Sequence, residues 1–91
     1  MDNSSNNKIT VNVRLSSQIA DTLGTNRVSV TVDESSTVSD VKEEIKKKHP
    51  DIEDQLDSTL PVISGKMVNS DQQISQGENI AFLSTAAGGW A

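Results

Sequence analysis

The sequence has no cysteine and very little aromatic surface, with one Phe, one Trp and no Tyr among its 91 residues. Without cysteine, the chain can form no disulfide, bind no zinc through thiolates and use no catalytic thiol. Thirteen acidic residues oppose eight basic ones, which gives a net charge of −5. Nucleic acid and anionic membranes attract basic surfaces, so we expect neither of them as a partner.

Long apolar runs are also missing. No run approaches the roughly 20 residues that a membrane-spanning helix needs, and no secretory signal is visible. We therefore expect a cytoplasmic protein that is a monomer when free. Ninety-one residues suffice for one small domain. The polar start "MDNSSNN" predicts a disordered N-terminal tail over residues 1–7.

Alternating apolar residues predict strands with one buried side at Lys8–Leu15 and Arg27–Val32. The connection between them, "SSQIADTLGTN", is expected to be a loose loop. Shorter strands are predicted at Leu60–Ser64, around Met67-Val68, and at Asn79–Leu83. We expect the first and last strands to pair in parallel, because the long intervening segment provides the crossover that parallel pairing needs.

The segment "TVSDVKEEIKKKHP" changes to a helical period, with Val38, Val41 and Ile45 on one face. Thr37 is a suitable N-cap for this helix, and Pro50 should prevent it from continuing beyond His49. One helix packed on one face of a mixed sheet is an α+β arrangement.

Charged residues on this helix have a simple interpretation. Glu43 and Glu44 stand three or four residues before the lysines 46–48, so exposed ion pairs worth a few tenths of a kcal/mol each are expected. The alternative is that the three lysines contact an acidic surface of a partner.

The residues that usually carry catalysis or metal binding are sparse. His49 has no nucleophile or second ligand near it in the sequence, so we expect a structural or solvated side chain. A second group could be imagined as a cation site, but it lacks calcium-loop spacing and is expected to be a solvated acidic loop. It consists of Asp51, Glu53, Asp54 and Asp57. The sequence therefore predicts no catalytic residue and no metal site.

The C-terminal segment "STAAGGWA" contains only small residues until Trp90, the one tryptophan in the chain. One interpretation is a floppy terminus. The other is a tail that enters a narrow tunnel in a partner, because a glycine backbone can approach the tunnel walls closely.

Three stretches, taken in order, resemble the MoaD-like and ThiS-like sulfur carriers, which are related to ubiquitin. They are "TVSDVKEEIKKKHPDIEDQL", "LPVISGKMV" and "ISQGENIAFLSTAAGG", and the resemblance covers residues 8–89. Three features depart from the family pattern. Ser84-Thr85 replace a proline pair, Ser64 replaces the usual Asn, and Trp90-Ala91 follow a diglycine that normally ends the chain.

The resemblance implies an α+β, ubiquitin-like β-grasp fold, with a mixed sheet of four or five strands and one main helix on one face. It places the domain at residues 8–84 and a flexible tail at residues 85–91. It also implies that the chain is a carrier rather than an enzyme, with no bound cofactor.

In such carriers a ubiquitin-activating-type adenylyltransferase uses ATP to adenylate the terminal glycine carboxylate, which here would be that of Gly89. Sulfur then displaces AMP, and the resulting thiocarboxylate serves a sulfur-accepting synthase. Ala87, Gly88 and Gly89 are the tail residues that the resemblance assigns to recognition. Relatives in archaea are also joined to lysines as protein modifiers.

Trp90-Ala91 would block this chemistry, because they turn the Gly89 carboxylate into an amide. The resemblance implies that a JAB/MPN-type zinc metalloprotease cuts between Gly89 and Trp90. Two alternatives remain at this point: a modifier conjugated to lysines, and a binding or adaptor subunit that is never activated.

Overall fold

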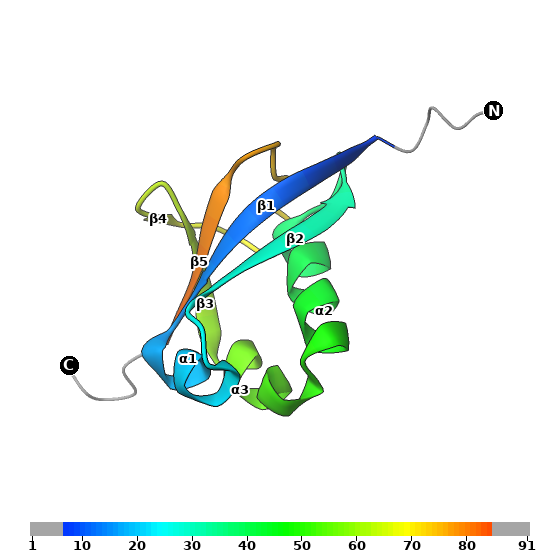
Figure 1. Ribbon diagram of the computed structural model, residues 1–91. Coiled ribbons are helices and arrows are strands. Elements are labelled where there is room, and N and C mark those ends of the chain that lie inside the picture. Colours follow the sequence, from blue (N-terminus) through cyan, green and yellow to red (C-terminus); the bar gives the residue numbers. More distant parts are fainter. Residues whose placement is uncertain (1–6, 85–91) are drawn as a thin grey trace.

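The computed structural model describes residues 7–84. Its strands form one five-stranded sheet in the order β2-β1-β5-β3-β4 (Figure 1). The elements in chain order are β1 (Lys8–Leu15), α1 (Ser17–Leu23), β2 (Arg27–Asp33), α2 (Val38–Lys48), the 3-10 helix η2 (Pro50–Ile52), α3 (Glu53–Asp57), β3 (Thr59–Ile63), β4 (Lys66–Met67) and β5 (Asn79–Ser84).

The predicted parallel pairing of the first and last strands is confirmed. β1 pairs with β5 in parallel, with Val13 opposite Ile80 and Leu15 opposite Phe82. β2 pairs antiparallel with the other edge of β1, and β3 pairs antiparallel with β5. The last strand therefore lies in the middle of the sheet, between two partners.

The connection between β1 and β2 is not the loose loop that the sequence suggested, because it contains the short helix α1. The Ser16 side chain caps this helix by accepting a hydrogen bond from the Ile19 backbone N–H. Gly24 ends it with a φ of 84°, a left-handed conformation that glycine adopts readily. Ile19 is fully buried, so α1 closes the end of the core and does not project into solvent.

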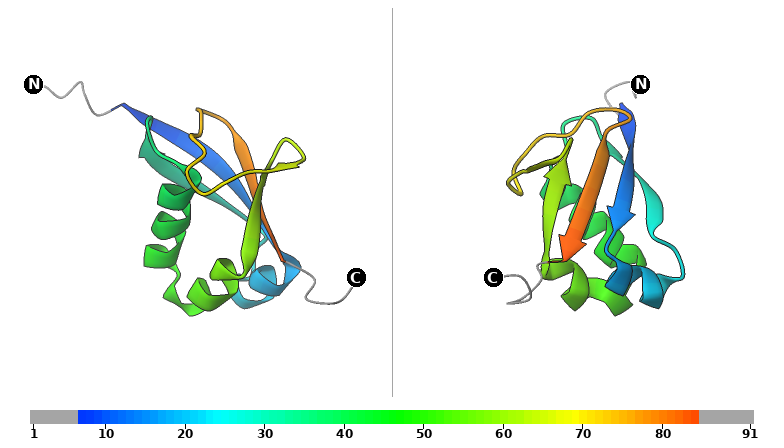
Figure 2. Two further views of the ribbon diagram at one scale, coloured as in Figure 1. Left: turned by 180° about the vertical axis from the view of Figure 1, so that it is seen from behind. Right: turned by 90° about the vertical axis from the view of Figure 1, so that its left-hand side faces the viewer.

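Helix α2 follows the sequence prediction closely. Thr37 and Asp40 form a reciprocal capping box at its start, and the helix ends at Lys48, just before Pro50. Val38, Val41 and Ile45 are each at most 1% exposed. Figure 2 (left) shows α2 lying across one face of the sheet, which confirms the α+β arrangement.

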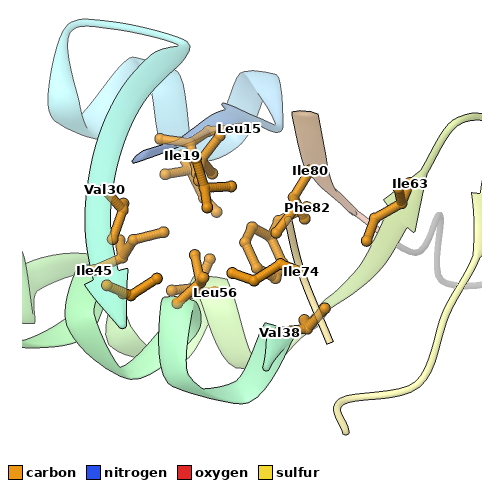
Figure 3. Close-up of a cluster of buried hydrophobic side chains, with 14 of the residues drawn as sticks. Leu15, Ile19, Val30, Val38, Ile45, Leu56, Ile63, Ile74, Ile80 and Phe82 are labelled. Carbon is orange, nitrogen blue, oxygen red and sulfur yellow. The ribbon is translucent and has the colours of Figure 1, made fainter. Parts of the chain in front are cut away.

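The core fills the space between α2 and the inner face of the sheet (Figure 3). The valines and isoleucines of β1 and β2 alternate inward, as predicted, and Phe82 of β5 is fully buried. Ile74, in the long loop before β5, is only 3% exposed and belongs to the same core. Ile52 and Leu56 of the segments that follow α2 are fully buried in it as well.

The turn between β3 and β4 contains Ser64, one of the departures from the family pattern. Ile63 pairs with Lys66 across a two-residue turn. Both turn residues have positive φ, 53° for Ser64 and 79° for Gly65. Such a turn favours Asn or Gly at its first position, so Ser64 is tolerated here at some cost in backbone energy.

The inner face of α2 provides a stability test. We expect Val41→Asp to lower the free energy of unfolding by several kcal/mol, roughly 3 or more, because it buries an unpaired charge in a thin core. Lys48→Glu, at an exposed position of the same helix, should change it by less than about 0.5 kcal/mol. Urea denaturation measures both, and a larger loss for Lys48→Glu would contradict the helix orientation.

Candidate functional site

The residues predicted to carry the chemistry are Ala87, Gly88, Gly89 and Trp90, and all four lie outside the described residues. The predicted boundaries of the two tails cannot be judged from residues 7–84 and stay predictions. What the structure does describe is the point from which the C-terminal segment departs, and the surface around that point.

The end of β5, where the C-terminal segment begins, is fixed by pairing with strands on both of its edges. Ser84, the last residue of β5, pairs with Thr59 at the start of β3. On the other edge of β5, Phe82 pairs with Leu15 at the end of β1. The side chains of Phe82 and Thr59 are buried, and Thr59 Oγ1 donates a hydrogen bond of 2.6 Å to the Leu56 carbonyl. β5 therefore ends at a fixed place, which lies beside α1 and α3 (Figures 1 and 2).

Within residues 7–84, no helix covers the outer face of the sheet; Figure 2 (right) shows the strands in front of the helices. Side chains of the β5, β3 and β4 half of this face are apolar. Leu60 pairs with Leu83, and Val62 pairs with both Ala81 and Met67. Leu60, Leu83 and Met67 are 42%, 44% and 69% exposed. We call Leu60, Val62, Met67, Ala81 and Leu83 the outer apolar patch.

Such a patch is informative because large apolar side chains that cluster on a surface commonly mark a contact with another protein. Sequence reasoning placed these residues on strands but did not recognise the patch. Their spacing carries a signal, since Leu60 with Val62 and Ala81 with Leu83 alternate with the buried positions Ile63, Ile80 and Phe82. The signal becomes interpretable only when the strand order brings the two runs together.

The β1 and β2 half of the outer face is polar. Its exposed side chains surround a hollow of about 660 Å³. Asn12, Arg14, Arg27, Ser29 and Asn79 line this hollow, together with Val13 and Val28. The outer face therefore has an apolar half and a polar half, and β5 lies at the boundary between them.

Ion pairs on the helical layer hold α2 against α3. Lys46 Nζ lies 2.5 Å from Asp57 Oδ1 and 3.4 Å from Glu43 Oε2. Hydrogen bonding to Asp57 raises the pKa of Lys46, and the same contact lowers the pKa of Asp57. The i,i+3 pairs expected on this helix are present as Lys46–Glu43 and Lys47–Glu44. These contacts give Asp57 a structural role.

The acidic residues after Pro50 are not in a loop, as the sequence suggested, but in the helical segments η2 and α3. Glu53 and Asp54 occupy the first turn of α3, where the helix dipole favours negative charge. His49 caps the end of α2 through its backbone N–H, which donates to Ile45. Between residues 7 and 84, no cluster of three or more His, Cys, Asp or Glu side chains could hold a metal ion.

The longest helix of the described chain, α2, has 11 residues, and none of the helices there has the length and apolar character to span a membrane.

Comparison with known proteins gives a family match over most of the chain. The model of the ThiS family matches residues 13–89, a range that ends at Gly89 and leaves out Trp90 and Ala91. No curated protein matches the chain by sequence.

Solved structures give the same fold. The crystal structure of small archaeal modifier protein 1 from Haloferax volcanii superposes with a TM-score of 0.77, at 20% identity, over 84% of this chain and 97% of that chain. The putative molybdopterin converting factor subunit 1 from Pyrococcus furiosus gives 0.73, at 20% identity, over 82% and 95%.

A ubiquitin-like protein from Trypanosoma brucei gives a TM-score of 0.61 at 16% identity, over 87% of this chain and 96% of that chain. At these identities the likeness shows the fold alone. It confirms the ubiquitin-like β-grasp fold.

The effect of a substitution on the free energy of unfolding distinguishes a residue of the outer apolar patch from a residue of the core. We expect Leu83→Ala to lower the free energy of unfolding by less than about 1 kcal/mol, because nearly half of its side chain is already in water. Phe82→Ala, one residue earlier and fully buried, should cost about 3–5 kcal/mol. Chemical denaturation compares the two, and similar losses would mean that Leu83 is covered in the free protein.

Proposed function

The chain belongs to the ThiS family, and we propose that it is a sulfur carrier whose working group is the carboxyl group of Gly89. The observation that carries this proposal is that the family match ends at Gly89. Small carrier proteins of this family are generally not enzymes. The catalytic groups and the ATP belong to a partner, and the chain binds no cofactor of its own.

The proposed activation begins at a free Gly89 carboxylate, which is a poor electrophile. A ubiquitin-activating-type adenylyltransferase joins it to the α-phosphorus of ATP, and pyrophosphate leaves. A sulfur nucleophile from a persulfide relay then attacks the acyl carbon, AMP leaves with the bonding electron pair, and reductive cleavage of the sulfur–sulfur bond by a thiol leaves a thiocarboxylate. The carrier then delivers this sulfur to a sulfur-accepting synthase in the cytoplasm.

In this proposal, the surface that binds the partner and the group that reacts belong to different parts of the chain. β5 contributes Ala81 and Leu83 to the outer apolar patch and then leads directly into the C-terminal segment. A partner that binds the outer apolar patch therefore also has the C-terminal segment next to it. Five residues beyond Ser84 reach at most about 18 Å when fully extended. The adenylation centre should lie within that distance of the docked edge of the sheet.

Trp90 and Ala91 require a processing step in this account. In the full-length chain, the carbonyl of Gly89 belongs to an amide, which cannot be adenylated. We propose that a JAB/MPN-type zinc metalloprotease hydrolyses the bond between Gly89 and Trp90. Ala87, Gly88 and Gly89 then form the narrow end that the activating enzyme recognises, because none of them carries a side chain larger than methyl.

The second candidate function is a protein modifier that is joined to lysines through the same activated Gly89. The Haloferax volcanii structure favours it, since that protein is named a small archaeal modifier. The two functions share the activation step and differ in the nucleophile that takes the acyl group. A third alternative, an adaptor that is never activated, would not need a free Gly89.

Activation can be tested by pyrophosphate exchange with the activating enzyme from the same organism. We expect exchange with residues 1–89 and none with residues 1–91, because the free carboxylate of the longer chain lies about 7 Å too far along. In a positioned reaction, a displacement of about 1 Å can cost on the order of 100-fold.

The matched control is residues 1–89 with Gly89→Val, which keeps the length and the carboxylate but adds bulk at the reacting carbon. We expect this variant to be inactive. Equal exchange by the full-length chain would show that Trp90-Ala91 is no barrier to activation. No exchange from residues 1–89 would favour the adaptor.

A further inference from the structure

One row of residues crosses the outer face of the whole sheet, from β2 to β4. Arg27 lies opposite Arg14, and Arg14 lies opposite Ala81 on its other side. Ala81 in turn faces Val62, and Val62 faces Met67. Two arginines at one end of the row are thus continuous with the outer apolar patch at the other.

The arginine pair is unusual in energetic terms. Directly opposed residues on neighbouring antiparallel strands have their Cβ atoms about 5 Å apart, and like charges in that position are destabilising. The far end of the same ladder has the favourable arrangement, because Lys8 faces Asp33 and their side chains form an ion pair of 2.9 Å. Arg14 and Arg27 are both exposed, and neither forms an ion pair with any residue between 7 and 84.

The surroundings of the pair are suited to a negatively charged group. Both arginines line the hollow of about 660 Å³, and Asn12, Ser29 and Asn79 add amide and hydroxyl groups to its wall. The guanidinium group binds carboxylates through two parallel hydrogen bonds. Among residues 7–84, no carboxylate side chain lines the hollow, although the chain as a whole carries a net charge of −5.

We infer that Arg14 and Arg27 receive carboxylate side chains of the protein that docks on the outer apolar patch. The occupant must be apolar on one side and anionic on the other, because Arg14 stands directly beside Ala81 of the patch. A protein surface with acidic residues next to an apolar ridge meets both requirements. A nucleic acid meets only one, and it would be repelled by the overall negative charge.

The inference rests on the proposed function in one respect, which is that the docked protein is the activating enzyme. Charge pairs at the rim of an interface act mainly on the association rate and make it dependent on salt. The arginines are then specificity residues for the encounter, and the acyl chemistry at Gly89 takes place elsewhere. They should affect KM and leave kcat unchanged.

The experiment uses residues 1–89 in the pyrophosphate exchange assay with the activating enzyme from the same organism. In low salt, we expect the double variant Arg14→Gln/Arg27→Gln to raise KM for the carrier about tenfold, with kcat unchanged. The KM of the unaltered carrier should rise with added sodium chloride, and that of the double variant should rise much less. Lys47→Gln/Lys48→Gln, at two exposed positions of α2 behind the sheet, is the charge-matched control and should behave like the unaltered carrier.

Thermal melting separates binding from structure. A structural role for the arginines predicts a lower Tm for the double variant, whereas the proposed role predicts an unchanged or higher Tm, because a like-charge pair is removed. An unchanged KM and salt dependence in the double variant would overturn the inference while leaving the proposed function intact. No exchange by unaltered residues 1–89 would overturn the proposed function and this assignment of the partner together.

Discussion

The central position of β5 is the constraint on which the rest of the structure depends. Ile80 and Phe82 place two almost fully buried side chains in the core from this strand. Its backbone pairs with β1 on one side and β3 on the other. The last strand of the described residues is therefore paired along both of its edges. A C-terminal segment that must be presented to a partner needs such an anchor, because movement at Ser84 would be carried along the segment.

Side chains alternate along β5, so one face of this strand contributes to the core and the other contributes to the exposed outer face of the sheet. Positions 80 and 82 face the core, while positions 79, 81 and 83 face outward. Ala81 and Leu83 of the outward set belong to the outer apolar patch, and Asn79 lines the hollow together with Arg14 and Arg27. Stability and recognition therefore use opposite faces of the same six residues. This separation allows the outer face to be fitted to a partner without weakening the core.

Much of the fold could be predicted from the sequence, because strict alternation in β1 and β2 and helical spacing in α2 are strong local signals. α1 was missed because it has only seven residues, one of which is fully buried. The only sequence signals of this helix are its two capping residues, Ser16 and Gly24. The outer apolar patch was missed for another reason. Leu60 and Leu83 are 23 positions apart, and only the pairing of β3 with β5 brings them together. The role of Gly89 rests on family membership and stays a prediction.

The most direct test of the account is the intact mass of the protein recovered from its own cells, expressed with an N-terminal tag so that the C-terminus matures naturally. The account predicts a chain that ends at Gly89, with a fraction heavier by the difference between one sulfur and one oxygen atom. A reagent that alkylates only thiocarboxylates should increase the mass of that fraction and of no other. A chain that keeps Trp90 and Ala91 and carries no sulfur, under conditions in which the activating enzyme is present and active, would contradict the account.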